Sequence, residues 1–220
     1  GSGGTAQTAL ALAKEAFAEW SAKDPSERMA IFDQALENII RQKYRIAALV
    51  TLSSGMTRDE ALDEVERLIE VIDDGCQDLD EGIEGKPSGV WAIFSEYNSP
   101  LAAPIGYAAA AMMAGNTVVI IPSKYAPVPV YFIYDLFVRA GLPDGVVNVV
   151  TCSRKEIDVI LEHPDVKGIT FVGSTPVGKL IYQKAAANGK RVQALCQAKN
   201  HALVMSDAPI ERTVAGIINS

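Results

Sequence analysis

The residues best placed to do chemistry are Gly173 and Ser174, which follow an apolar run late in the chain. The run, residues 168–172, stops at Gly173, and an amphipathic helical pattern begins near Thr175, followed by a proline. Ser174 or Thr175 can cap that helix, and the proline suits its first turn. Free N–H groups and the helix dipole can then hold an anion such as a pyrophosphate. The pattern predicts a nucleotide site, although an ordinary strand-to-helix cap explains Gly-Ser equally well when these residues are taken alone.

Apolar runs and helical patterns indicate the elements that would position this corner. Runs typical of strands buried on both faces lie at residues 90–94, 117–121, 146–150 and 168–172. Helical patterns lie at 101–114, 128–140, 155–162, 176–188 and 209–218, and further strand-like stretches lie at 192–195 and 202–205. Because parallel strands need such crossovers, the alternation predicts an α/β fold: a Rossmann-like parallel sheet with helices on both faces.

The predicted topology also indicates where a ligand would bind. Ligands of open parallel sheets sit at the carboxyl ends of the strands. In this chain those ends lie at residues 95–98, 122–124, 151–153 and 173–174. No G-x-G-x-x-G sequence follows the first strand, so the ordinary dinucleotide fingerprint is absent.

The first third of the chain, residues 5–86, is predicted to form helices that pack on this α/β core. Asp24–Glu27 is a helix start signal, and the apolar pattern behind it continues to about Leu52. Thr57–Glu60 is a second capping box. The predicted organisation is a linker or cloning scar at 1–4, helices at 5–86 and the Rossmann-like core at 87–220.

Charge and hydropathy exclude several classes of partner. The 220 residues have a net charge of −7, and most of the acidity lies between Asp59 and Glu84, where a solvated helix face explains it best. No basic stripe is visible, so we expect no nucleic-acid partner. The sequence shows no run of eighteen apolar residues and no signal-peptide pattern. We therefore expect no membrane partner and a cytoplasmic location.

The cysteines and histidines do not suggest a metal site. Cys76, Cys152 and Cys196 are unevenly spaced without a C-x-x-C pair, and His163 and His201 are isolated. This usage favours a reducing compartment and no bound metal. Cys152 follows the third predicted strand, so it is either a small buried residue or, where a nearby charge lowers its pKa, a reactive thiol.

Four motifs resemble those of the aldehyde dehydrogenase superfamily. They are an aromatic-Asn-x-Pro turn at 97–100, an A-G-N-T-V strand entry at 114–119, an A-G-L-P-x-G-V-x-N-V-V segment at 140–150, and F-[TV]-G-S at 171–174. Two further segments, 191–193 and 198–201, resemble the methylmalonate-semialdehyde dehydrogenase branch, which makes acyl-coenzyme A. The resemblance extends over residues 5–220 and implies the N-terminal, cofactor-binding domain of such an enzyme.

The resemblance implies a role for Asn98. Its side-chain amide would donate to the oxyanion that forms when a thiolate attacks an aldehyde, and donors of this kind contribute on the order of 10²–10³ in rate. The alternative is an asparagine that holds the turn before Pro100.

The resemblance also implies a dinucleotide, NAD, as cofactor. Gly173 and Ser174 would meet its pyrophosphate, and residues 95–97 would lie at its nicotinamide end. The complete set of expected cofactor-binding residues is Ser95, Glu96, Tyr97, Pro122, Ser123, Lys124, Gly173, Ser174 and Val177.

The chain departs from the family's pattern at several strand ends. The second strand of family members usually ends in Lys-Pro-x-Glu, which holds the adenosine ribose, whereas here Ile121 replaces the lysine and Lys124 the acid. Cys152 places a side chain where a glycine usually lets adenine approach, and Gln197 stands at another glycine position. Leu195 stands where many members have a general-base glutamate, which the coenzyme A-acylating branch also lacks. These departures leave open whether NAD still binds and whether NADP replaces it.

The resemblance implies that the family's catalytic and oligomerisation domains are absent. The nucleophilic cysteine would lie in a segment beyond Ser220, and a β-hairpin that usually precedes the first strand is not found between Gly82 and Lys86. We therefore expect the cofactor-binding half of an NAD-dependent, coenzyme A-acylating aldehyde dehydrogenase, without turnover of its own. Two alternatives stay open. One is an isolated or engineered monomeric scaffold domain without activity, and the other is one piece of a split enzyme whose partner is the catalytic half.

Overall fold

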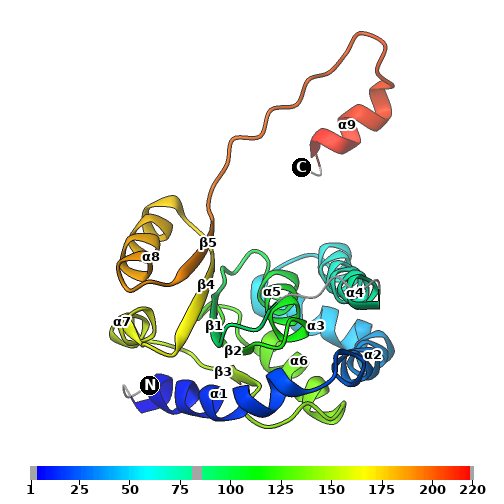
Figure 1. Cartoon of the computed structure of the whole chain (residues 1–220). Coiled ribbons are helices and arrows are strands. Elements are labelled where there is room, and N and C mark those ends of the chain that lie inside the picture. Colours follow the sequence, from blue (N-terminus) through cyan, green and yellow to red (C-terminus); the bar gives the residue numbers. More distant parts are fainter. Residues whose placement is uncertain (1–3, 81–85, 219–220) are drawn as a thin grey trace.

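A five-stranded parallel sheet forms the centre of the molecule (Figure 1). The structure is a computed structural model and describes residues 4–80 and 86–218. The strands lie in the order β3-β2-β1-β4-β5, with bounds β1 Val90–Phe94, β2 Thr117–Ile121, β3 Val147–Val149, β4 Val166–Val172 and β5 Arg191–Leu195. The predicted parallel α/β sheet is confirmed.

The strands end in step, which creates a single carboxyl edge. Phe94 at the end of β1 lies opposite Ile121 of β2 and opposite Phe171 of β4. Val172 at the end of β4 lies opposite Leu195 of β5. The loops that follow these strands therefore emerge next to one another, where α/β sheets bind their ligands.

Both faces of the central strands are buried, which explains their continuous apolar sequences. Neighbouring side chains of β1 and β2 enter two separate apolar clusters. Ile93, Val118 and Ile120 belong to one cluster, and Ala92, Val119 and Ile121 belong to the other.

Helices cover both faces of the sheet (Figure 1). The first cluster is shared with α2 Pro25–Arg41, α3 Lys43–Ser54, α4 Arg58–Asp80, α5 Ala102–Met113 and α6 Val128–Arg139. The second is shared with α1 Gly4–Ala22, α7 Arg154–Glu162 and α8 Thr175–Ala187. Trp20, near the end of α1, joins the first cluster instead, and its indole N–H donates to the Met112 carbonyl at 3.0 Å. The helix α1 therefore links the two layers.

Both predicted helix start signals are confirmed. The Asp24 carboxylate accepts from the backbone N–H of Ser26 at 2.9 Å. At α4, Thr57 N–H donates to Glu60 Oε2 at 2.7 Å, and Glu60 N–H donates to Thr57 Oγ1 at 3.3 Å. Hydrogen bonds from Ser26 lower the pKa of Asp24, and those from Thr57 lower the pKa of Glu60.

The prediction of one helical pattern from Asp24 to about Leu52 is wrong in one respect. The chain leaves helical geometry at Gln42, with φ −112° and ψ 13°, and its N–H bonds back to the Ile39 carbonyl at 3.0 Å. A one-residue break leaves the spacing of apolar residues on both sides almost unchanged. Periodicity therefore could not reveal that α2 and α3 are separate helices.

The prediction that the acidic stretch is a solvated face is wrong for Glu64. This side chain of α4 is only 2% exposed. It accepts hydrogen bonds from the segment that begins α5. An acid on the buried face of an amphipathic helix thus serves a neighbouring helix.

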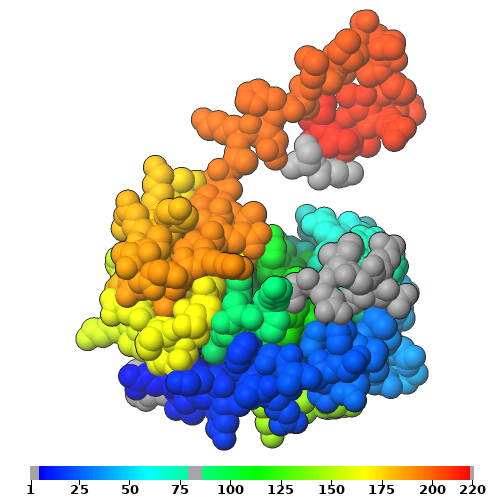
Figure 2. Space-filling view, viewed as in Figure 1, coloured from blue at the N-terminus to red at the C-terminus, as the bar shows by residue number. Residues whose placement is uncertain are grey.

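The predicted strand at 202–205 is also absent from the structure. After β5 the chain continues as an extended segment and ends in α9 Ile210–Ile218, which stands away from the sheet (Figures 1 and 2). None of the residues of α9 is buried, and Leu203 is 88% exposed. A strand needs a neighbour for its backbone groups, and no described segment pairs with 202–205.

Two predictions fall outside the described residues. Most of the expected scar at 1–4 lies there, and so does most of the interval between Gly82 and Lys86 where the family hairpin was not found. The predicted boundary between residues 86 and 87 remains a prediction.

Candidate functional site

The carboxyl edge brings most of the predicted cofactor residues together. Ser95 continues β1, and its backbone N–H donates to the Ile121 carbonyl of β2 at 3.2 Å. Gly173 continues β4, and its N–H donates to the Leu195 carbonyl of β5 at 3.1 Å. The positions predicted from the sequence thus lie on adjacent loops of one edge. Their role as cofactor ligands stays a prediction.

The N-terminus of α8 opens at this edge. Ser174 occupies the N-cap position with extended geometry, φ −67° and ψ 143°, yet its side chain makes no capping hydrogen bond. The prediction of a cap at Ser174 or Thr175 is confirmed for the position of Ser174 and wrong for its hydroxyl. The first hydrogen bond of the helix is made by backbone groups alone, since Gly178 N–H donates to the Ser174 carbonyl at 2.9 Å. A helix start whose amides are not capped by its own hydroxyl suits an anion.

At two glycines beside this helix start, a side chain would collide with neighbouring atoms. A Cβ atom at Gly173 would lie 2.8 Å from Phe171 Cζ. A Cβ atom at Gly178 would lie 2.3 Å from Cys196 Sγ and 3.2 Å from Phe171 Cε1. Only glycine therefore lets the backbone of the corner lie against the Phe171 ring, and any group at the corner can approach the bare backbone closely.

Ser95 offers an unpaired polar group at the same edge. Its hydroxyl oxygen is buried and has no hydrogen-bond partner among the residues that the structure describes. Buried hydroxyls are usually paired, so an unpaired one next to a binding edge fits a polar ligand atom. Together with the α8 start, this is a second feature of the structure that fits a dinucleotide.

The end of β2 does not fit the family's usual ribose contacts. Ile121 is buried in the second apolar cluster, so no cation stands where the family has lysine. Lys124 is exposed, and its ammonium lies 4.9 Å from the centre of the Tyr125 ring. Tyr125 in turn makes an edge-to-face contact with Tyr97, with ring centres 6.4 Å apart. Sequence reasoning identified Tyr97 and Lys124 but missed Tyr125. The available signal was that Tyr125 directly follows the predicted residues Pro122, Ser123 and Lys124.

The remaining predicted positions flank this edge. Glu96 is half-buried and follows Ser95, whereas Val177 is exposed in the first turn of α8. Pro122 is buried, and Ser123 accepts from the Tyr125 N–H at 3.4 Å.

Asn98 lies at a separate cavity, away from α8. It is exposed and lines a cavity of about 440 Å³ against α4. The other lining residues are Met56, Glu60, Asp63, Glu64, Arg67 and Ile218. Sequence reasoning missed Glu64 and Arg67, although their three-residue spacing places both on one face of α4.

Arg67 is the cation of this cavity. No ion pair joins it to any residue in the described part of the chain, whereas Glu60 and Glu64 both accept hydrogen bonds from neighbouring groups. The cavity therefore places an amide donor, Asn98, together with a guanidinium group that can receive an anion.

The thiols of Cys76 and Cys152 are not activated in this structure. Burial and the nearby Glu156 carboxylate raise the pKa of Cys152 to about 11. Burial and the carboxylates of Asp33 and Asp73 raise the pKa of Cys76 to about 12. Both thiols are protonated at neutral pH, which rules out the reactive-thiol hypothesis for Cys152 in this state.

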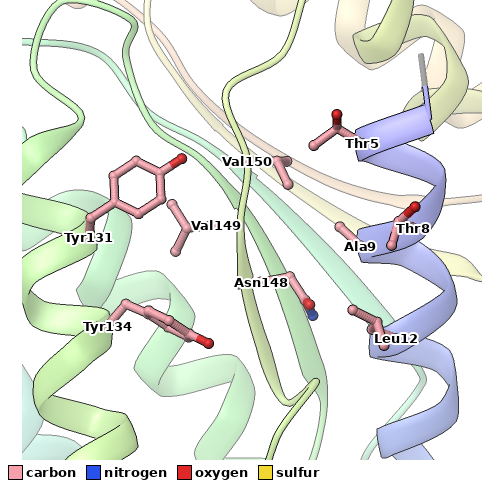
Figure 3. Close-up of a pocket in the computed structure, with 9 residues that line it drawn as sticks. All are labelled: Thr5, Thr8, Ala9, Leu12, Tyr131, Tyr134, Asn148, Val149 and Val150. Atoms are coloured by element: carbon pink, nitrogen blue, oxygen red, sulfur yellow. The ribbon is translucent and has the colours of Figure 1, made fainter. Parts of the chain in front are cut away.

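A further cavity lies along the outer edge of β3. Figure 3 shows Tyr131 and Tyr134 of α6 facing Thr8 and Leu12 of α1 across that strand. Its volume is about 490 Å³, and none of its lining residues is charged. It reaches the carboxyl end of β3 at Val149 and Val150, and it offers no acid, base or cation for catalysis.

A metal site and a membrane span are both absent from the described residues. No group of three or more His, Cys, Asp or Glu residues there could hold a metal ion. No helix of residues 4–80 or 86–218 is long and apolar enough to cross a membrane.

Comparison with known proteins extends the sequence resemblance. The profile of the aldehyde dehydrogenase family matches residues 2–220. A malonate-semialdehyde dehydrogenase of Geobacillus kaustophilus is 38% identical over 227 residues, which cover 96% of this chain and 47% of that protein. The chain spans about half the length of the curated relatives it matches.

Solved structures agree with this match. The crystal structure of methylmalonate-semialdehyde dehydrogenase from Oceanimonas doudoroffii is 33% identical with a TM-score of 0.91, covering 98% of this chain and 47% of that one. An aldehyde dehydrogenase of Pseudomonas syringae, solved as a mutant with NAD⁺ and octanal, is 31% identical with the same TM-score and the same coverage.

Proposed function

The chain belongs to the aldehyde dehydrogenase family, and we propose that it is the cofactor-binding half of an NAD-dependent enzyme that oxidises an aldehyde. The observation that carries this proposal is the carboxyl edge, where the uncapped start of α8 and the unpaired Ser95 hydroxyl lie on adjacent loops. The related enzyme of Pseudomonas syringae, crystallised with NAD⁺, supports NAD as the ligand.

The residues of the edge would divide the work of holding NAD. The backbone of Gly173 and Ser174 would meet the pyrophosphate, because the positive end of the α8 dipole lies there. The Ser95 hydroxyl would bond to a polar group nearer the nicotinamide. When bound, NAD supplies the hydride acceptor. Ile121 and Lys124 do not reproduce the family's ribose contacts, so we expect weaker binding of the ribose.

Asn98 would act on the aldehyde. A positioned amide donor stabilises negative charge that develops on the carbonyl oxygen during attack by a thiolate. The structure places Asn98 on an exposed loop beside a cavity of about 440 Å³, where an aldehyde could reach it. The thiolate itself would come from the family's nucleophilic cysteine, which the resemblance puts outside this chain; Cys76 and Cys152 are protonated at neutral pH.

Within the same cavity, Arg67 is the group that suits an aldehyde with a carboxylate, while Glu60, Asp63 and Glu64 add negative charge to the lining. The Arg67 guanidinium shares the cavity with Asn98 and can pair with a carboxylate in two parallel hydrogen bonds. The relatives named as malonate-semialdehyde dehydrogenases act, by their names, on an aldehyde of this kind. Leu195 cannot act as a general base, which supports release of the acyl group to coenzyme A rather than to water.

We further propose that the partner of this chain is a polypeptide with the remaining half of the family fold. The supporting observation is the set of exposed apolar side chains between residue 203 and the end of α9: Leu203, Ile210 and Ile218 are each at least three-quarters exposed. Apolar surface of this extent is typical of a surface that another polypeptide covers.

Turnover assays test both proposals. We expect the purified chain, with NAD and malonate semialdehyde, to form no NADH, because it lacks an activated thiolate. Addition of the C-terminal half of a malonate-semialdehyde dehydrogenase, with coenzyme A, is expected to restore NADH formation. Turnover by the chain alone would contradict the division of roles. Failure of the two halves to co-purify would contradict the proposed partner.

A second candidate function is a binding domain without catalysis. The replacement of the usual lysine by buried Ile121 favours it, because a domain that no longer holds the ribose has lost part of its cofactor recognition. A direct measurement of NAD binding separates this candidate from the first.

A further inference from the structure

We infer that Glu64 is a positioning residue, which fixes the Asn98 loop to the helix that carries Arg67. This inference rests on the proposed roles of Asn98 and Arg67 and adds a third residue to the same site. Glu64 belongs to α4, whereas Asn98 belongs to the loop between β1 and α5.

One oxygen of Glu64 holds the whole end of that loop. Glu64 Oε1 accepts from Ser99 Oγ at 2.8 Å, from Leu101 N–H at 3.1 Å and from Ala102 N–H at 2.9 Å. Ser99 Oγ also accepts from Ala103 N–H at 3.3 Å. Leu101, the N-cap residue of α5, has no capping side chain of its own, so a buried carboxylate from another helix takes that place.

The bonds to Glu64 act on Asn98 through the next residue. Ser99 follows Asn98 directly, and its hydroxyl donates to the carboxylate. On the other side, Ser95 is tied to β2 through its backbone N–H. The loop is therefore held at both ends, and the end next to Asn98 is held by a charged acceptor, which makes stronger hydrogen bonds than a neutral one.

The helices α4 and α5 lie too close together to slide freely. A Cβ atom at Gly106 of α5 would lie 2.9 Å from Val71 Cγ1 of α4. A Cβ atom at Gly75 of α4 would lie 2.7 Å from Met113 Sδ of α5. Glycines on both helices thus permit close packing, and α4 is a rigid support for the loop.

Glu64 and Arg67 are three residues apart on α4, and both line the cavity of Asn98. A substrate held by its carboxylate at Arg67 has its carbonyl oxygen at a distance set by its own carbon chain. The distance from Arg67 to the oxyanion donor, Asn98, must match that length. Glu64 sets this distance, because its carboxylate binds the loop of Asn98 to the helix that carries Arg67.

Nuclear magnetic resonance of the full chain tests this inference. In Glu64→Gln, which keeps the shape but removes the charge, we expect hydrogen exchange at the Leu101 and Ala102 amides to accelerate at least about tenfold. We also expect the Asn98 side-chain amide to lose order on the nanosecond timescale. The matched control is Asp63→Asn, which removes one charge at the neighbouring position of the same cavity and is expected to change neither readout.

The outcomes separate positioning from capping. Faster exchange at Leu101 and Ala102 with an unchanged Asn98 side chain would overturn the inference, because Glu64 would then only cap α5. Where Glu64→Gln does not fold, Ser99→Ala removes one of the three donors and is expected to loosen Asn98 to a smaller extent. An unchanged Asn98 in folded Ser99→Ala would also overturn it. Neither readout requires cofactor, so a failure to bind NAD would count against the proposed function alone.

Discussion

Replacement of Gly173 by valine is expected to weaken NAD binding about 100-fold, equal to about 2.7 kcal/mol. The Cβ atom alone would lie 2.8 Å from the Phe171 ring, and the two methyl groups would fill the corner at the start of α8. The ring must shift or the corner must open, and either change removes the close backbone approach that a pyrophosphate needs. Calorimetric titration of the variant with NAD measures the effect.

The matched control for Gly173→Val is Gly216→Ala in α9, where an added Cβ atom meets nothing within 4 Å. We expect this variant to bind NAD as the unchanged chain does. Circular dichroism shows whether Gly173→Val is folded. A folded Gly173→Val that binds NAD with unchanged affinity would place the pyrophosphate elsewhere.

Replacement of Trp20 by alanine is expected to lower the free energy of unfolding by about 3–5 kcal/mol. Trp20 is 1% exposed, fills the first apolar cluster and donates to the Met112 carbonyl at 3.0 Å. The substitution creates a cavity and leaves that carbonyl without its indole donor. A loss of this size approaches the whole stability of many domains, so much of the variant is expected to be unfolded. Urea denaturation followed by circular dichroism measures it.

The control for Trp20→Ala is Leu12→Ala on the same helix, because Leu12 is 47% exposed. We expect this change to cost less than about 1 kcal/mol. Equal losses in the two variants would show that α1 does not link the two layers of the molecule through Trp20.

The central strands were predictable because their burial leaves a direct mark on the sequence. The bounds predicted for β1 and β2 agree with the structure at both ends, since strands buried on both faces need unbroken apolar runs. Their parallel order followed from the helices between them. The prediction that a ligand binds at the carboxyl edge followed from that order alone.

The failed predictions share a different physical cause. The one-residue break at Gln42 hardly changes the apolar spacing, and pairing of the segment 202–205 would need a neighbouring strand, so local pattern records neither. The apolar run at 202–205 shows that the segment could be a strand. It does not show that a neighbouring strand is present.

Motifs mark Asn98 and Gly173 in the sequence, and their roles in a site stay predictions. Glu64 and Arg67 carried no motif, and their acidic surroundings suggested a solvated face. Their importance comes from the contact between α4 and the β1–α5 loop, which are 35 to 38 residues apart in sequence. The same holds for Tyr125, which acquires meaning through its contact with Tyr97.

Calorimetric titration of the unchanged chain with NAD tests the central claim most directly. The claim is that the edge formed by Ser95, Gly173 and the start of α8 still holds a dinucleotide, despite Ile121 and Lys124. We predict saturable binding with one site per chain at or below millimolar NAD. The absence of heat at millimolar NAD, with the chain folded by circular dichroism, would contradict the claim and favour a domain that has lost its cofactor.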